Sequence, residues 1–271
     1  TFEGFEDGAE AVRALAQSRL FPSNCRLLDP GEAALTGAAP GGKALLVLGF
    51  EGPTPVDGSM AHALELCRDH GGERSGERGR GGDRRGGEGE RARRRERARR
   101  GEEAEQAREP EDRADGSEST WRDAFLRAPY LRDTLIAAGI LAETFETAVT
   151  WDRLITFAGD VRTSTEAALG GAGRVTCRLT HAYPDGAAPY FTVLAPARRG
   201  SEVEQWDEVK AAASEAIAAA GGTITHHHAV GRDHRAWYDR QRPDPFAEAL
   251  LAAKRAVDPA GILNPGVLVD P

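Results

Sequence analysis

The segment from residue 73 to residue 118 constrains the fold more than any other part of the chain. It holds 14 arginines and 14 acidic residues, and it contains no Val, Ile, Leu, Met, Phe, Tyr or Trp. A stretch without apolar side chains cannot offset the conformational entropy that is lost on ordering. The hydrophobic core must therefore come from residues 1–72 and 119–271. The simplest organisation is one domain that is interrupted by a disordered, low-complexity insertion.

Three interpretations of this charged segment remain open. The run from Arg91 to Arg97 is dense enough in arginine for a nucleic-acid or partner-binding tail. We favour a solvated insertion, because acidic residues alternate with the arginines and cancel their charge. The third interpretation is a locally shifted reading frame, since Arg, Gly, Glu and Ala all have GC-rich codons. Resequencing the gene across this segment would test it.

Charge and cysteine usage narrow the class of protein. The chain of 271 residues has a formal net charge of -8, which argues against a nucleic-acid partner. Its three cysteines are dispersed without a C-x-x-C pair, so we predict a reducing, cytoplasmic location. No apolar run approaches the roughly 18–20 residues that span a bilayer. The first five residues carry neither a Met nor a targeting signal, and we expect the C-terminal part of a longer protein.

Periodicity predicts alternating helices and strands outside the charged segment. Helices are predicted over residues 7–18, 56–70, 121–139, 152–169, 201–220, 233–240 and 245–257. Strands are predicted over residues 25–28, 43–51, 141–151, 175–181 and 190–194, and again at the β-branched stretch 223–225 that leads into three histidines. The strand at 43–51 is expected to be buried because its apolar run is continuous. Ser201 with Glu204 predicts a capping box. The pattern favours an α+β fold, an antiparallel sheet with helices on one face.

Two glycine-rich stretches were considered as nucleotide sites. The stretch from Gly37 to Ala44 nearly spells a phosphate-binding loop, but the residue after Lys43 is not Ser or Thr. It also precedes a strand instead of joining a strand to a helix, so no helix N-terminus faces a phosphate. Residues 170–173 lie between a helix and a strand, the wrong order for a dinucleotide fingerprint. We expect both stretches to be plain loops.

The most informative short motif is the triplet His226, His227 and His228, which uses three of the seven histidines. In a strand, His226 and His228 would share one face while His227 points away. One interpretation is a metal site, with His181 or His234 as a further ligand. Another is acid–base work and anion binding by the imidazoles. A polar surface strand is the third.

For Tyr190 and Arg132 the sequence pattern alone does not indicate a chemical role. Tyr190 lies on a strand beyond the turn at 184–186, with Tyr183 on the other side, and tyrosines on strands are more often packing residues. Arg132 lies on an amphipathic helix, where arginines usually face solvent.

Several motifs together resemble a known family. The block Gly222-Thr-Ile-Thr-His-His-His-Ala-Val-Gly231, followed by Asp258-Pro-Ala-Gly-Ile-Leu-Asn-Pro-Gly266, is similar to the C-terminal end of FAD-linked oxidases of the vanillyl-alcohol oxidase type. Within that family it most resembles the alkyldihydroxyacetonephosphate synthases of ether-lipid synthesis and their bacterial relatives. Further matches are Tyr130-Leu-Arg-Asp133, Glu143-Thr-Phe-Glu-Thr147, Trp151-Asp-Arg153, Thr176-Cys-Arg178 and the stretch from Tyr183 through Tyr190-Phe191.

The resemblance implies a ferredoxin-like substrate, or cap, domain whose FAD-binding domain lies N-terminal to it and is absent here. By motif, Tyr190 would be the acid/base near the substrate carbon and Arg132 would orient the substrate. His226, His227 and His228 would bind its phosphate and shuttle protons. His228 and the turn at Asn264 would contact the cofactor or its domain. The implied partners are FAD, a phosphorylated or carboxylated small molecule and, as an option, a second copy of the chain. This chain alone is expected to be inactive.

The D-lactate and 2-hydroxyacid dehydrogenases share this type of domain and supply the alternative function, as does an FAD-linked alcohol dehydrogenase. They resemble this chain less, because they carry Gly-Glu-His-Gly-Ile-Gly in place of residues 226–231. Their metal-binding members need that Glu and a further His, and here Tyr190 takes a place like that of the His. The resemblance therefore disfavours a metal. A remnant binding domain without catalysis is the last alternative. Ala229, where the synthases usually have glycine, leaves the substrate open.

Overall fold

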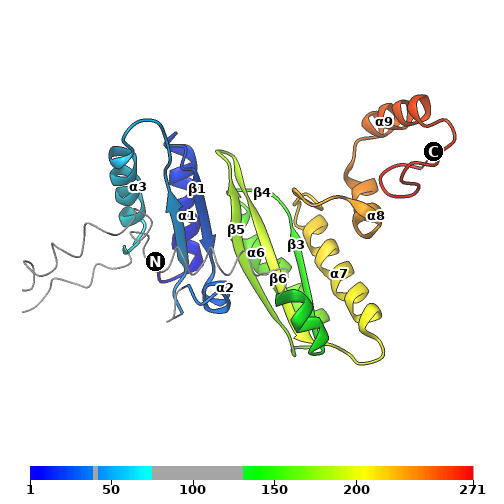
Figure 1. Ribbon diagram of the computed structural model, residues 1–271, viewed down its shortest axis with the longest axis horizontal. Helices are drawn as coiled ribbons and strands as arrows, with labels where there is room; N and C mark the ends of the chain where they lie inside the picture. The colour runs from blue at the N-terminus through cyan, green and yellow to red at the C-terminus, as the bar shows by residue number, and fades with distance from the viewer. Residues whose placement is uncertain (39–41, 75–130, 271) are drawn as a thin grey trace, which may run out of the picture.

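The computed structural model describes residues 1–38, 42–74 and 131–270 (Figure 1). The charged segment beyond residue 74, and the part of the predicted helix 121–139 that precedes residue 131, lie outside the described residues. Residues 131–137 are helical, as predicted. None of the described helices is long and apolar enough to cross a membrane.

A single antiparallel sheet organises the described residues. Its path is β2-β1-β5-β6-β3, and β4 pairs with β6 beside β3. The strands are β1 (Asn24–Leu28), β2 (Leu45–Gly49), β3 (Ile140–Glu146), β4 (Val149–Thr150), β5 (Arg174–Ala182) and β6 (Gly186–Pro196). The long hairpin of β5 and β6 forms the middle of the sheet, so it joins the N-terminal strands to those that follow the charged segment.

The long helices of the main core cover one face of this sheet. The long helices that contribute to its main core are α1 (Phe5–Gln17), α6 (Leu154–Ala168) and α7 (Glu202–Ala219), with α3 (Asp57–Asp69) against α1. The short helix α2 (Pro30–Leu35) contacts β5 and β1, and α8 (Gly231–Gln241) and α9 (Asp244–Val257) follow α7 towards the C-terminus. The predicted α+β class, an antiparallel sheet with its long helices on one face, is confirmed.

Strand alternation separates the main core on one face of the sheet from the opposite face, which is polar along β5 but carries a small apolar cluster at β1 and β2. Along β5, Val175, Cys177 and Leu179 are buried in the helix-covered core, while the intervening side chains point to the opposite face. Phe145 and Phe191 lie opposite each other on β3 and β6, and their rings stack at 5.0 Å between centroids within that core. We call the opposite side the open face.

Helix α2 lies on the open face and was not predicted from the sequence. Asp29 caps it by accepting a hydrogen bond from the backbone N–H of Glu32 at 2.7 Å, and it also accepts from the backbone N–H of Cys177 at 2.8 Å. Glu32 is buried and accepts hydrogen bonds from Thr176 and Arg178 of β5. The helix is therefore attached to the sheet through two buried carboxylates and through a small apolar cluster of Leu28, Ala33, Ala38 and Leu45.

Two local predictions were wrong. Strand β2 is an edge strand and is mostly half-buried, because only one neighbour covers it. Ser201 stands at the N-cap of α7 but makes no capping hydrogen bond; the carboxylate of Glu202 instead accepts from the N–H of Gly200 at 3.0 Å. The capping box was predicted from spacing alone, which does not show whether the side chain turns towards the helix.

The topology follows the ferredoxin-like order through β3, α6, β5, β6 and α7, with β3 beside β6. The fourth strand of that pattern would be the stretch after α7. Here that stretch makes only separate backbone contacts along β3 and β4, from Thr223 N–H to Ala148 carbonyl at 3.0 Å and from His226 N–H to Glu146 carbonyl at 3.1 Å. The predicted histidine strand is therefore wrong, and an irregular loop takes its place.

The stacked pair in the core yields a stability prediction. Phe191 is fully buried, so we expect Phe191→Ala to lower the free energy of unfolding by about 3–5 kcal/mol, the range for large aromatic truncations in a core. Urea unfolding followed by circular dichroism measures it. Phe246→Ala on α9, where the side chain is 52% exposed, is the matched control and should cost less than about 1 kcal/mol. Equal losses in both variants would contradict this core.

Candidate active site

Three polar side chains form a row across the open face. The strand registers place Arg178 of β5 opposite Tyr190 of β6, and Tyr190 opposite Glu146 of β3. Residues in such register point to the same face and lie close enough to touch. The guanidinium carbon of Arg178 lies 3.9 Å from the centroid of the Tyr190 ring. The row thus begins on the Glu32–Arg178 ion pair and ends on a second carboxylate, that of Glu146.

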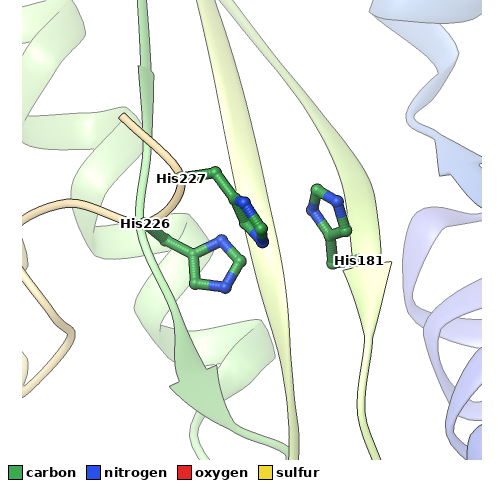
Figure 2. A group of neighbouring side chains, drawn as sticks. All are labelled: His181, His226 and His227. Atoms are coloured by element: carbon green, nitrogen blue, oxygen red, sulfur yellow. The ribbon is translucent and has the colours of Figure 1, made fainter. Parts of the chain in front are cut away.

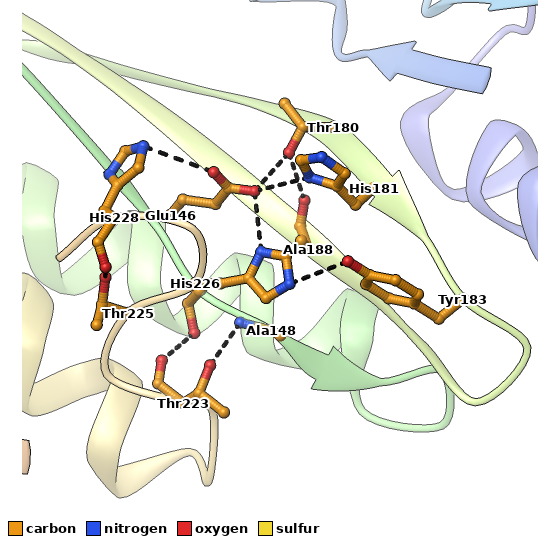
Figure 3. Close-up of polar contacts among 11 residues, drawn as sticks. Glu146, Ala148, Thr180, His181, Tyr183, Ala188, Thr223, Thr225, His226 and His228 are labelled. Carbon is orange, nitrogen blue, oxygen red and sulfur yellow. Dashed lines mark hydrogen bonds and ion pairs between the residues drawn. The ribbon is translucent and has the colours of Figure 1, made fainter. Parts of the chain in front are cut away.

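Glu146 is the centre of the site (Figure 3). Its side chain is 4% exposed, and its Oε1 lies 2.8 Å from Thr180 Oγ1, 3.1 Å from His181 Nδ1 and 3.2 Å from His226 Nδ1. His228 Nε2 lies 3.5 Å from the other oxygen, Oε2. One buried carboxylate therefore gathers side chains from β3, β5 and the loop that follows α7.

A bulge in β5 lets two consecutive residues reach this carboxylate. The pairing of β5 with β6 shifts between Leu179 and His181. In an unbroken strand Thr180 and His181 would point to opposite faces, whereas the extra residue at a bulge re-aims a side chain. Both side chains consequently contact Glu146.

The hydrogen bonds keep Glu146 ionised. Burial by itself raises the pKa of Glu146, but the hydrogen bonds from Thr180, His226 and His181 outweigh burial and bring the pKa below its ordinary value. An ionised carboxylate only accepts hydrogen bonds. Nδ1 of His181 and Nδ1 of His226, which are hydrogen-bonded to it, therefore act as donors.

Close packing fixes the start of the histidine loop, residues 221–230. A Cβ on Gly222 would lie 2.5 Å from Cε2 of Phe157 on α6, so only glycine lets the backbone pass there. Gln241, the last residue of α8, donates to the Gly222 carbonyl at 2.8 Å and accepts from the Ile224 N–H at 2.9 Å. Thr147 Oγ1 donates to the Thr223 carbonyl at 2.5 Å. These contacts hold the loop against the end of β3.

The loop turns sharply within the triplet itself. His227 has a φ of 54°, which is incompatible with an extended strand, and the hydroxyl of Thr225 donates to the His228 carbonyl at 2.8 Å across the turn. His226 and His228 still reach the same partner, Glu146. They do so because the loop wraps around the carboxylate, and not because a strand puts them on one face.

The third imidazole, His227, lies against His181 (Figure 2). Nitrogens of His181, His226 and His227 approach within 4.8 Å of one another, a spacing that could hold a metal ion. The rings of His181 and His227, however, are stacked 19° from parallel at 4.4 Å. Because nitrogen lone pairs lie in the ring plane, the lone pairs of stacked rings do not converge on one ion. The arrangement would need a ring to rotate, and the absence of a metal stays a prediction.

His234, the other histidine considered for this cluster, does not join it. It is buried at the start of α8, where its Nδ1 lies 3.3 Å from the Ala229 carbonyl. Burial lowers the pKa of His234, which favours the neutral ring. We interpret it as a packing residue that fastens the end of the histidine loop.

Tyr190 lies next to His228 on the open face. Arg178 covers one side of its ring, and the His228 ring meets it edge-on at 5.5 Å between centroids. Among the described residues no hydrogen bond from its hydroxyl is found. The hydroxyl and imidazole groups of Tyr190 and His228 are of the types that transfer protons.

Arg132 and Asn264 are not part of the Glu146 cluster. Arg132 is exposed on the helix 131–137, and in the described part of the chain no ion pair links it to Glu146. Asn264 is exposed in a turn with a φ of 47°. Arg232, in the first turn of α8, donates to the neighbouring carbonyl of Pro265 at 3.4 Å, which ties this turn to the helix that begins three residues after His228. The roles predicted for Arg132 and Asn264 stay predictions.

Sequence reasoning missed three functional candidates. Glu146 lies in the motif Glu143–Thr147, but nothing in the spacing indicated that its carboxylate accepts a hydrogen bond from His226, 80 residues later in the chain. Arg178 could have been found from strand alternation, which puts it on the face of Tyr190. Tyr183, whose hydroxyl lies 3.2 Å from His226 Nε2, lies beside the turn and within a stretch that resembles the family, but neither signal indicated its contact with His226.

The fold and this cluster of carboxylate, imidazole and phenol groups describe the C-terminal domain of FAD-linked oxidases. The family model for "FAD linked oxidases, C-terminal domain" matches residues 1–268, and the chain belongs to this family. The predicted family is therefore confirmed.

Individual proteins that are similar in sequence support the same family. The alkyldihydroxyacetonephosphate synthase of Trypanosoma brucei brucei is 30% identical over 154 residues, 56% of this chain and 25% of the relative. That of Caenorhabditis elegans is 34% identical over 163 residues, 58% of this chain and 27% of the relative. The chain thus spans about a quarter of the length of these curated relatives.

Solved structures share the fold. An alkyldihydroxyacetonephosphate synthase structure superimposes with a TM-score of 0.63 at 17% identity, covering 95% of this chain and 42% of the other. The 4-ethylphenol oxidase from Gulosibacter chungangensis, in its isoeugenol complex, gives a TM-score of 0.57 at 13% identity, covering 100% of this chain and 53% of the other. At these identities the likeness establishes the arrangement of the sheet and helices.

Removal of the central charge gives the second prediction. In Glu146→Gln the amide oxygen can replace Oε1 as acceptor, but the negative charge is lost and the NH₂ group faces Nε2 of His228, so we expect the free energy of unfolding at pH 7 to fall by about 1–3 kcal/mol. Because the pKa of Glu146 is lowered in the folded state, its contribution exists above the unfolded pKa of about 4.3 and is lost as the pH falls through the folded pKa. The gap between wild type and variant should therefore close in acid.

Urea unfolding at a series of pH values measures both effects. The control is Glu208→Gln on α7, which removes an exposed ion pair with Arg198 and should change stability by less than about 0.5 kcal/mol. A gap between wild type and Glu146→Gln that stays constant into strong acid would show that Glu146 does not act through its charge.

Proposed function

We propose that this chain is the substrate domain of an FAD-dependent enzyme of the alkyldihydroxyacetonephosphate synthase type. In that reaction the acyloxy group of a phosphorylated ketone is replaced by an alkoxy group. The observation that carries the proposal is the Tyr190 ring, which lies between Arg178 and His228 beside the Glu146 cluster, and whose hydroxyl has no hydrogen bond to another described residue. The synthase-named relatives support the substrate class.

Tyr190 is the proposed acid/base. Exchange of one oxygen-linked group for another requires proton transfers near neutral pH, and a positioned phenol beside an imidazole can make them. Arg178 and His228 fix the ring from two sides, while the buried Glu146 holds His228. This chain's contribution to the reaction is thus a proton donor and acceptor at a fixed position.

The imidazoles of His181 and His227 are the proposed phosphate-binding groups. His227 is exposed, and the side chain of His181 is 41% exposed, so both rings can turn a nitrogen towards a bound anion. Phosphate favours cationic and N–H donors. Arg132 is kept as a further substrate contact on the strength of the motif that it shares with the synthases. A phosphorylated ligand would bind at the mouth of the cluster, and Tyr190 would face its reacting end.

FAD fits this chain only in part. No glycine-rich turn of the dinucleotide or P-loop pattern joins a strand to a helix in the described residues, so they offer no cradle for a pyrophosphate. His228 and the turn at Asn264, which Arg232 ties to α8, are the groups proposed to face the cofactor. When bound, FAD supplies the covalent chemistry at the substrate carbon. We therefore propose that a separate FAD-binding domain of the same enzyme holds most of the cofactor.

The cellular setting belongs to the same proposal. Cys25, Cys67 and Cys177 are free thiols in the described structure, and burial raises the pKa of Cys25 to about 12. Unpaired cysteines of this kind fit a reducing, cytoplasmic location. A homodimer remains an option that the oligomeric state of the purified enzyme would decide.

The test is the exchange reaction in the FAD-loaded enzyme that contains this chain. With a 1-acyl dihydroxyacetone phosphate and a long-chain alcohol, we expect Tyr190→Phe to lower kcat by about 10²–10⁴-fold, because it removes the acid/base hydroxyl and keeps the ring. Tyr238→Phe is the matched control, since Tyr238 stacks with Arg242 on α8 outside the cluster. No exchange by wild type, together with flavin bleaching by 2-hydroxy acids without oxygen, would favour the dehydrogenase alternative.

A separate prediction concerns the chain alone. Because its described residues offer no pyrophosphate cradle, we expect the purified 271-residue chain to be colourless and not to retain FAD during gel filtration. Absorbance at 450 nm measures the bound flavin. Stoichiometric FAD in the purified chain would contradict the proposal that a separate domain holds most of the cofactor.

A further inference from the structure

A second tyrosine belongs to a chain of three hydrogen-bonded groups that the proposed acid/base does not use. The hydroxyl of Tyr183 lies 3.2 Å from His226 Nε2, and His226 Nδ1 lies 3.2 Å from Glu146 Oε1 (Figure 3). Hydroxyl, imidazole and carboxylate in this order form the arrangement that activates a hydroxyl in many enzymes.

The direction of these hydrogen bonds follows from the carboxylate. Glu146 is held ionised and only accepts, so His226 must donate from Nδ1. In the neutral imidazole the proton on Nδ1 leaves a lone pair on Nε2. The Tyr183 hydroxyl therefore donates to Nε2, and His226 stands ready to take the phenolic proton.

The backbone holds Tyr183 in this position. The indole of Trp151, which is buried, donates to the Tyr183 carbonyl at 2.8 Å, and the Tyr183 N–H donates to the Gly186 carbonyl at 2.8 Å. A Cβ on Gly186 would lie 2.4 Å from the Val149 carbonyl oxygen, so the turn accepts only glycine there. The side chain itself is 38% exposed, which leaves the hydroxyl open to a ligand.

The two tyrosines are served by different oxygens of one carboxylate. His226, the partner of Tyr183, contacts Oε1 of Glu146, whereas His228, which meets the Tyr190 ring, lies nearest Oε2. The replacement removes one proton from the incoming hydroxyl, and a second group can donate a hydrogen bond or a proton to the departing carboxylate oxygen. Two separate tyrosine–histidine pairs, Tyr183 with His226 and Tyr190 with His228, suit two proton transfers better than one shared group.

From this geometry we infer that Tyr183 is a second proton-transferring residue, which accepts the proton of the incoming alcohol and passes its own to His226. The alcohol O–H breaks, its proton binds the Tyr183 oxygen, and the phenolic proton moves to Nε2. The resulting imidazolium is paired with the Glu146 carboxylate, and the alcohol oxygen keeps the electron pair with which it bonds to the substrate carbon. The assignment to an alcohol rests on the proposed function; the relay itself rests on the hydrogen bonds.

The relay is tested first without activity, on the wild-type chain. In ¹⁵N-histidine NMR spectra at neutral pH we expect His226 to be protonated at Nδ1 and to accept a hydrogen bond at Nε2. Tyr183→Phe should move the His226 Nε2 resonance, and Tyr238→Phe should leave it in place. A His226 protonated at Nε2, or a resonance that does not respond to Tyr183→Phe, would overturn the relay.

The catalytic part is tested in the FAD-loaded enzyme. Tyr183→Phe should lower kcat for the exchange by about 10²-fold and leave KM for the acyl substrate unchanged, with Tyr238→Phe like wild type. A kcat equal to that of the control overturns the inference even where the exchange itself occurs. Where wild type shows no exchange at all, the proposed function fails, and the NMR result alone decides whether the hydroxyl–imidazole–carboxylate chain exists.

Discussion

The site depends on one buried negative charge. The Glu146 carboxylate is 4% exposed, and a carboxylate removed from water is unfavourable by several kcal/mol unless its oxygens accept hydrogen bonds. Thr180, His181 and His226 provide them, with His228 beside the second oxygen. The need to satisfy this charge explains why the histidine loop leaves strand geometry: a regular fourth strand could not bend around the carboxylate.

The sheet supplies the frame in which that charge is placed. The same β5 residues that alternate between core and open face set which side chains can meet, and a one-residue slip would exchange Cys177 for Arg178. The bulge between Leu179 and His181 then adds a contact that strict alternation forbids. The register of β5 against β6 therefore determines both which side chains pack in the core and which polar side chains meet on the open face.

Prediction from the sequence worked where a local signal decides the structure. Periodicity predicted the helices other than α2, the central hairpin and the class of fold, because amphipathic spacing and turn residues act over a few neighbours. It failed at the histidine stretch, since β-branched residues favour a strand but long-range bonds from Thr147 and Glu146 override them. Glu146 itself could not be predicted as the centre: its partners lie 34 to 80 residues away, and only the folded sheet brings them together.

Stability and chemistry are coupled at this point of the molecule. A variant that removes one imidazole leaves the buried carboxylate short of a donor, so it weakens the fold and the reaction together. The tyrosine hydroxyls differ in this respect, because neither contacts Glu146 directly: Tyr183 acts through His226, and Tyr190 stands next to His228. The tyrosines are therefore where chemistry can be separated from folding, whereas changes at the histidines or at Glu146 report on both.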